Sequence, residues 1–162
     1  MNDDQIDCLL GSLEPDDVHG WQAPIPREIA AFRDVPLRLS IGTSNAENRA
    51  AEAVAPAPNG EELALARRVL RDLTTVLGQV QVEFAKEEAQ ERAAIEKSPK
   101  PIEVPPIEDP HLWIEREFVQ EAVAEGRLPE RWTFVIGRAG WPDFGYHLEF
   151  EGTTFDELWA GD

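Results

Sequence analysis

The fold is decided by residues 132–151, near the C-terminal end of the sequence, which read WTFVIGRAGWPDFGYHLEFE. Large apolar residues occupy every second position at each end of this stretch: Trp132, Phe134 and Ile136, then Tyr146, Leu148 and Phe150. A period of two is typical of strands that bury one face. Glycine, proline and aspartate interrupt the pattern between the two ends, as in a turn. We therefore expect two strands of an antiparallel sheet.

Two further strands are expected around this pair. Glu151 and Gly152 predict a turn that folds residues 153–159 back onto the preceding strand, with Phe155 and Trp159 on one face. Much earlier in the sequence, residues 36–41 show the same alternation, with Leu37, Leu39 and Ile41 at every second position. These segments supply the remaining strands of a small sheet.

Helical periodicity occupies the middle of the sequence. Over residues 61–97, apolar side chains recur at spacings of three and four, which predicts one long amphipathic helix: Leu63, Ala66, Leu70, Leu73, Leu77, Val80 and Phe84. Asn59 is a suitable N-cap for it. A shorter helix is expected over residues 111–126, with Gly126 at its end.

The predicted fold class is α+β, with a small, mainly antiparallel sheet packed against one long helix and a shorter second helix. Residues 1–34 contain prolines and scattered apolar residues, and we expect an N-terminal arm with one short helical turn. Residues 35–162 then form a single domain. Within it, residues 42–60 have little to bury and predict a mobile loop, and residues 98–110 hold five prolines and predict an extended connector.

Charge narrows the classes of partner. The sequence has 32 acidic and 15 basic residues, a formal net charge of −17. Such a charge repels nucleic acid and anionic membranes and attracts basic surfaces. There is no basic leader and no apolar run of membrane-spanning length, so we expect a cytoplasmic protein. Cys8 is the single cysteine, which excludes an internal disulfide and a cysteine-cluster zinc site.

Catalytic motifs give little support to an enzyme. His147 and Glu149 form an H-x-E, but the P-C-x-x-C that a zinc deaminase needs does not follow. With Asp143 nearby, these residues are compatible with a His/carboxylate cluster, but a polar, solvent-facing row of an antiparallel strand is the favoured interpretation, because such strands show that alternation in any case. Nucleotide-binding and nucleophile motifs are absent from the sequence. We therefore expect no enzymatic activity, no cofactor and no metal.

A binding surface for a protein is the favoured interpretation of the C-terminal residues. An aromatic anchor surrounded by acids is the composition expected of a site that receives a basic partner. Trp141 and Phe144 alternatively fold back and cap the end of the sheet. The predicted partner-binding residues are Trp141, Asp143, Phe144, His147, Glu149, Glu151, Asp156 and Glu157.

The order of these segments resembles a family of small acidic bacterial proteins encoded beside polymorphic toxins. The resemblance lies in the strand at 35–41, EELALAR at 61–67, the Trp/Phe segment at 113–119, the W-x-F strand and GYHLEFEG at 145–152. It implies a cytoplasmic immunity protein that binds and neutralises a cognate toxin. From the charge we expect that partner to be a toxin domain with a basic surface, and we expect the chain to be a monomer or homodimer. It implies no catalytic residue.

Three other functions are compatible with the sequence. An acidic mimic of nucleic acid would inhibit a DNA- or RNA-binding protein, and it requires carboxylates spaced like phosphates along one face. An enzyme would require His147, Glu149 and Asp143 to converge in a pocket. A protein whose charge serves only solubility would require neither.

Overall fold

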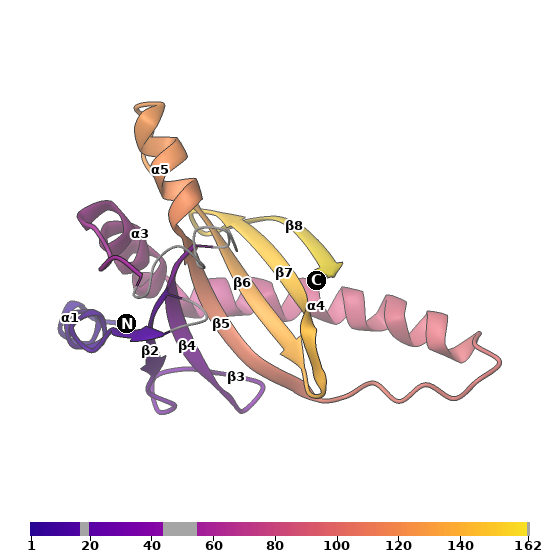
Figure 1. Ribbon diagram of the computed structural model, residues 1–162. Coiled ribbons are helices and arrows are strands. Elements are labelled where there is room, and N and C mark those ends of the chain that lie inside the picture. Colours follow the sequence, from indigo (N-terminus) through magenta and orange to yellow (C-terminus); the bar gives the residue numbers. More distant parts are fainter. Residues whose placement is uncertain (17–19, 44–54, 162) are drawn as a thin grey trace.

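The computed structural model describes residues 1–16, 20–43 and 55–161, which fold into one α+β structure (Figure 1). The predicted fold class is confirmed. Within these residues, none of the helices combines the length and apolar character needed to cross a bilayer. The helices are α1 (Asp3–Gly11), α3 (Gly60–Arg71), α4 (Leu73–Glu96) and α5 (Arg116–Ala124). The strands are β1 (Glu14–Asp16), β2 (Gly20–Ile25), β3 (Ala31–Phe32), β4 (Val35–Gly42), β5 (Ile107–Glu115), β6 (Arg131–Arg138), β7 (Trp141–Glu151) and β8 (Thr154–Gly161).

The strands form one sheet in the order β1-β2-β4-β5-β6-β7-β8, with β3 paired to β4 outside this path. All pairs are antiparallel except β4 with β5. Parallel neighbours need a long crossover connection, and α3 and α4 lie within it. Figure 1 shows α4 crossing behind the sheet. Helices α1, α3 and α4 therefore lie against one face of the sheet, which we call the helix face.

The core lies between the helix face and α1, α3 and α4. The alternating residues of β6 and β7 are all buried on this face, as the period of two predicted: Trp132, Phe134, Ile136, Tyr146, Leu148 and Phe150. Leu37, Leu39 and Ile41 of β4 join the same cluster. Burial of large apolar side chains is the main source of stability in such a core.

The single long helix of the prediction is two helices, α3 and α4, separated at Asp72. Asp72 has φ −99° and ψ 17°, outside the helical range, so the chain changes direction there. The break allows α3 to pack against α1 and β5 while α4 continues across the sheet to β8. Asn59 caps α3 as predicted: its side chain accepts from the backbone N–H groups of Glu61 and Glu62.

The prediction of a second helix over residues 111–126 is correct only for its second half. Residues 107–115 form β5, in the centre of the sheet, and the helix α5 begins at Arg116. Leu112 and Ile114 are fully buried on the helix face. Pairing with β4 on one side and β6 on the other outweighs the local helical pattern. A bulge between Glu108 and His111 accommodates Pro110 in the strand.

The N-terminal segment differs from the predicted arm. Residues 3–11 form the helix α1, which buries Ile6 and Leu9 in the core. Residues 20–25 form β2, a full partner of β4 in the sheet. The sequence did not indicate this strand, because its apolar residues are scattered and interrupted by proline. Of the β2 residues that face the helices, only Ala23 and Ile25 are buried. Most of the predicted mobile loop, residues 44–54, lies outside the described residues.

The C-terminal half of α4 is tied to the sheet by a polar cluster at Tyr146. The Tyr146 hydroxyl hydrogen-bonds the Glu91 carboxylate and accepts from Arg138 Nε at 3.3 Å. Arg138 also lies 3.6 Å from Glu88 Oε1 and 3.4 Å from Glu91 Oε2. Helix α4 is therefore held on the sheet as far as Glu91, well beyond the end of its apolar stripe at Phe84.

We expect Tyr146 to titrate unusually high. Burial, followed by the hydrogen bond with Glu91, raises the pKa of Tyr146 to about 12, whereas an unfolded tyrosine titrates at about 10. Between these values the unfolded chain loses its tyrosine proton first, so the free energy of unfolding should fall as pH rises from about 10 to about 12. Because Tyr146 is the single tyrosine, phenolate absorbance reports it directly.

The control is Tyr146→Phe, whose stability should lack this fall between pH 10 and 12. A phenolate midpoint near 10 in the folded protein would contradict the burial of the hydroxyl.

Candidate functional site

The second face of the sheet, turned away from α4, is polar. Register places on it Arg38, Ser40, His111, Trp113, Thr133, His147, Glu149, Glu157 and Trp159. We predicted that His147, Glu149 and Glu151 lie in a row on one face of a strand. The register of β7 agrees with that prediction. Several members are nevertheless buried, among them Ser40, His111, Thr133 and Glu149. Buried polar groups of this kind are hydrogen-bonded: Thr133 donates to Glu115 at 3.0 Å.

The predicted partner-binding residues do not form one cluster. Trp141 begins β7 and Glu151 ends it, so nine residues of strand, about 30 Å, separate them. Trp141 is 39% exposed and packs edge-on against Phe144, which in turn packs against Tyr146 on the helix face. Phe144 therefore caps the end of the core, the alternative left open by the sequence. The side chain of Asp143 lies outside what the structure describes.

The other predicted residues do come together, where β7 turns into β8. Glu149, Glu151, Asp156 and Glu157 all lie near this hairpin, with His147 further along β7. Gly152 has φ +60° and makes the turn, and its backbone N–H donates to the Glu130 carbonyl at 2.9 Å. The acidic part of the predicted site is thus a local feature of one hairpin.

Trp159 lies on the other face from the one the sequence predicted for it. Phe150 pairs with Phe155, but Glu149 pairs with Glu157, so Asp156 is an extra residue in β8. Such a bulge shifts the alternation by one position. The prediction that Phe155 and Trp159 share a face is therefore wrong: Phe155 packs on Phe150, whereas Trp159 pairs with His147 on the second face.

His147 is held by its neighbours in a structural role. Its ring stacks on the Trp159 indole with centroids 3.8 Å apart and parallel planes. Burial lowers the pKa of His147, and the negative charge of Glu149 opposes that shift. The Glu149 carboxylate instead accepts from Trp159 Nε1 at 3.0 Å and from Arg131 Nε at 3.1 Å. In the described part of the chain, no hydrogen bond joins His147 to a carboxylate.

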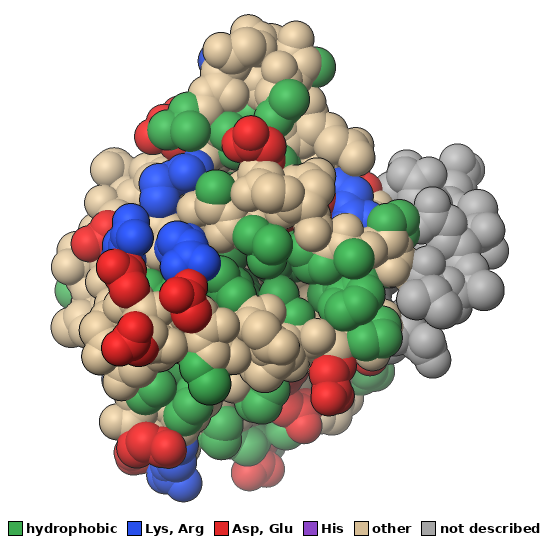
Figure 2. Space-filling model, turned by 90° about the vertical axis from the view of Figure 1, so that its left-hand side faces the viewer, with side chains coloured by type: hydrophobic (Ala, Val, Ile, Leu, Met, Phe, Trp, Pro, Cys, Tyr) green, Lys and Arg blue, Asp and Glu red, His purple; other side chains and the backbone are tan. Residues whose placement is uncertain are grey.

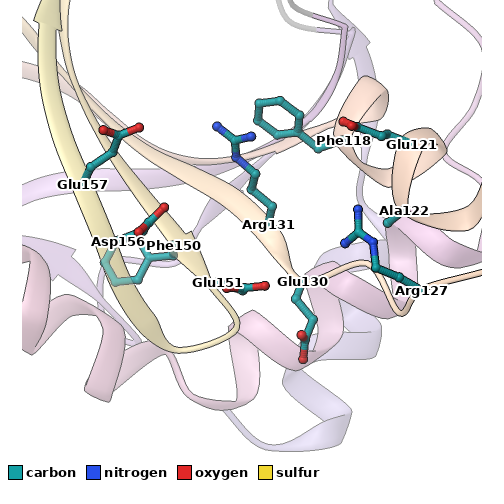
Figure 3. A pocket seen from close by; sticks show the side chains of 10 residues that line it. All are labelled: Phe118, Glu121, Ala122, Arg127, Glu130, Arg131, Phe150, Glu151, Asp156 and Glu157. Atoms are coloured by element: carbon teal, nitrogen blue, oxygen red, sulfur yellow. The ribbon is translucent and has the colours of Figure 1, made fainter. Parts of the chain in front are cut away.

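A pocket of about 400 Å³ opens between α5 and the β7–β8 hairpin. Figure 3 shows Glu121 and Arg127 on one side of it, Asp156 and Glu157 on the other, and Arg131 between them. The remaining lining comes from Phe118, Ala122, Glu130, Phe150 and Glu151. The acids of the hairpin, predicted from the sequence, thus form one wall of an acidic pocket.

Both arginines of the pocket are already engaged by acids outside its lining. Arg131 forms an ion pair with Glu149, and its guanidinium lies 4.0 Å above the centre of the Phe118 ring. Arg127 donates to Glu125 at 2.6 Å, and that hydrogen bond and charge raise the pKa of Arg127. The charge of Arg127 also acts on Glu121 and Glu151 of the lining, so the two arginines offset part, but not all, of the negative charge of the five lining carboxylates.

The carboxylates that line the pocket are unpaired. Among the described residues, no Lys or Arg lies within ion-pair distance of them: Glu121, Glu130, Glu151, Asp156 and Glu157. Their oxygens accept hydrogen bonds and favour a cation with several donors, such as guanidinium or ammonium. The described residues hold no group of three or more His, Cys, Asp or Glu side chains suited to a metal ion.

Several basic side chains elsewhere pair with a nearby acid. Figure 2 shows the side of the molecule that carries α1 and α3, where Lys and Arg side chains gather next to acids. Arg67 pairs with Asp7, and Arg71 pairs with Asp3 at 3.0 Å. Part of the excess negative charge lies at the acidic pocket, whose five carboxylates form no ion pair with the described residues.

The second wall of the pocket depends on α5, which is fixed through Arg116. Arg116 Nε donates at 2.7 Å to Glu62, a fully buried residue at the start of α3, and Arg116 Nη2 donates to the Pro56 carbonyl at 2.9 Å. Sequence reasoning missed the residues on this wall, Phe118, Glu121 and Arg127, together with Glu130 and Arg131. The acidic composition of residues 115–130 was the one feature of the sequence that could have indicated these residues as part of a site.

No family model, curated protein or solved structure matches this chain. Its function is therefore inferred from its own residues. The geometry offers an acidic recess of side-chain size, with an aromatic ring at one side and fixed walls.

Proposed function

We propose that this chain is a cytoplasmic binding protein that neutralises a protein partner by receiving basic side chains of that partner in the acidic pocket. The observation that supports this most is the set of five unpaired carboxylates around one recess, while Arg127 and Arg131 are both engaged elsewhere. A partner arginine would meet several acceptors at once, and charge-assisted hydrogen bonds to carboxylates are among the stronger polar contacts.

The partner we propose is the toxin domain implied by the resemblance of the sequence to immunity proteins. A net charge of −17 steers a basic domain towards this protein and speeds association. Toxins that act on nucleic acid carry basic clefts, and an acidic protein seated there blocks access to the substrate. Neutralisation then requires contact only, and no catalytic group.

The arrangement of the carboxylates favours this proposal over a nucleic-acid mimic. A mimic presents a row of acids along a surface, whereas here the acids of α5, residue 130 and the β7–β8 hairpin face a common recess. A recess suits an inserted side chain. The enzyme hypothesis loses its central group, since His147 is stacked on Trp159 and the Glu149 carboxylate is bound by Arg131 and Trp159.

Charge reversal on the two walls of the pocket tests the proposal. If the neighbouring gene encodes such a toxin domain, Glu121→Lys combined with Asp156→Lys should weaken binding of that domain by at least about tenfold, and should reduce the salt dependence of association. Both residues are exposed, so the fold should survive. The measurements are calorimetric titration at several salt concentrations and rescue of growth on co-expression with the toxin.

The matched control is Glu14→Lys with Glu28→Lys, which changes the net charge equally at exposed positions away from the pocket. We expect this control to keep rescue and most of the affinity. An equal loss in both double variants would show that total charge, and not the pocket, determines binding, and would overturn the proposed site.

A further inference from the structure

The sheet has two edges of very different character. β1 has three residues, one of them Pro15, which has no N–H to donate. β8 has eight residues without proline, and among the described residues it pairs with β7 alone. The Phe155 N–H near the start of β8 donates to Gln79 Oε1 of α4 at 3.1 Å, and the residues that follow present backbone N–H and C=O groups that can pair with another chain. β8 is therefore the edge at which a further strand can be added.

The regular part of this edge is Glu157–Gly161. Its register with β7 continues without interruption from Glu157 opposite Glu149 to Gly161 opposite Gly145, beyond the bulge at Asp156. Five residues of strand give about 17 Å of pairing surface. Figure 1 shows that α4 continues past this edge of the sheet, and α4 contacts β8. An added strand would thus lie alongside β8 with α4 towards its helix face.

The Trp159 indole is held in an orientation that leaves one of its faces open on the side of the free edge. One face of its indole is covered by the His147 ring, and Nε1 is fixed by the hydrogen bond to Glu149. The indole is nevertheless 40% exposed. Because side chains on one face of a sheet stack from strand to strand, the uncovered indole face is turned towards the position of the missing strand. An arginine there would stack on the ring.

The negative charge along β8 favours a strand with basic side chains as its partner. Glu157 is exposed, lies on the same face as Trp159 two residues earlier, and has no basic partner among the described residues. An added strand with basic residues at alternate positions would place one beside Glu157 and the next beside Trp159. A second copy of this chain, with its own −17 charge and acidic β8, fits this edge poorly.

We propose that the β8 edge accepts one extended segment of the basic partner as an additional strand, with Arg or Lys at alternate positions. This inference rests on the proposed function, in that the same partner supplies the basic side chain of the acidic pocket. The pocket lies at the start of β8 and the regular edge follows it, so one partner surface spans both.

The test uses a short synthetic peptide of alternating arginine and threonine, acetylated and amidated, and the same peptide methylated at every backbone nitrogen. Both peptides carry the same charge, but the second cannot donate backbone hydrogen bonds. We expect the first to bind the intact chain at least about tenfold more tightly, because methylation removes the backbone hydrogen bonds that the peptide would donate to β8. Hydrogen exchange should slow at amides of residues 157–161.

Trp159→Ala should weaken binding of the unmethylated peptide severalfold. Trp141→Ala is the matched control, since that indole is equally exposed at the far end of β7, and it should leave the affinity unchanged. Equal binding of both peptides, or no slowing of exchange in β8, would overturn strand addition. So would a dimeric chain whose β8 amides are protected before peptide is added.

The two proposals fail separately. If the methylated peptide binds as tightly as the other, and binding is lost in the Glu121→Lys, Asp156→Lys variant, the pocket stands and the edge does not. If that variant binds the unmethylated peptide normally while Trp159→Ala does not, the edge stands without the pocket.

Discussion

Replacing Arg116 with methionine is expected to lower the free energy of unfolding by about 3 to 5 kcal/mol. The partner of Arg116 is Glu62, whose side chain is fully buried, while Arg116 itself is 13% exposed. Without the guanidinium, the Glu62 carboxylate keeps its hydrogen bond from the Asn59 backbone N–H at 2.9 Å but loses the charge that balances it. A buried, uncompensated carboxylate is costly because burial removes its hydration.

Denaturant unfolding measures this loss, and two further variants identify its cause. Arg67→Met removes an ion pair of two substantially exposed side chains, Arg67 with Asp7, and should cost at most about 1 kcal/mol. Glu62→Gln added to Arg116→Met removes the stranded charge, so the double variant should recover part of the stability. A loss below about 1 kcal/mol for Arg116→Met alone would mean that Glu62 is hydrated without its partner.

The same substitution links stability to the proposed site. Arg116 is the first residue of α5, and its contacts with Glu62 and the Pro56 carbonyl hold that end of the helix against the start of α3. Helix α5 supplies Phe118 and Glu121 to the acidic pocket. A variant that remains folded without this contact should therefore bind the toxin domain more weakly, although Arg116 does not line the pocket.

The outline of the fold was predictable wherever local periodicity and burial agree. In β6, Trp132, Phe134 and Ile136 face the helices and are fully buried, so the period of two is visible in the sequence. In β5 the signals conflict, because Trp113 and Glu115 lie on the second face and the run resembles a helix start. Hydrogen bonding to strands on both sides decides the outcome there, and those strands are distant in sequence.

The candidate site was predictable only for its local half. Glu151, Asp156 and Glu157 belong to one hairpin and are brought together by its turn. Glu121, by contrast, reaches the same pocket from α5, and nothing in its own neighbourhood indicates that position. The face of Trp159 could not be predicted, since an additional residue at Asp156 reverses the alternation without any proline or glycine to mark it.

The fully buried Trp132 is the second position where a large effect is expected. Its ring stacks on Phe150, with centroids 4.6 Å apart and planes 15° apart, and its Nε1 donates to the Gly152 carbonyl at 2.8 Å. Trp132→Ala should lower the free energy of unfolding by about 3 to 5 kcal/mol, as expected for loss of a large buried aromatic side chain. Trp132→Phe keeps much of the packing and should lose less, because the main additional loss is one hydrogen bond of about 1 kcal/mol.

Denaturant unfolding again gives the measurement, and Trp141→Ala is the matched control, since its indole is 39% exposed and should contribute about 0.5 kcal/mol or less. Equal losses for Trp132→Ala and Trp141→Ala would contradict the assignment of Trp132 to the core. The Trp132 ring supports Phe150, which lines the acidic pocket, and its hydrogen bond fixes the turn at Gly152 between the two strands that carry the pocket's acids. Trp132→Phe should therefore weaken binding of the toxin domain even though the variant remains folded. The reason is that the Gly152 carbonyl loses the hydrogen bond that helps to position Glu151 and Asp156.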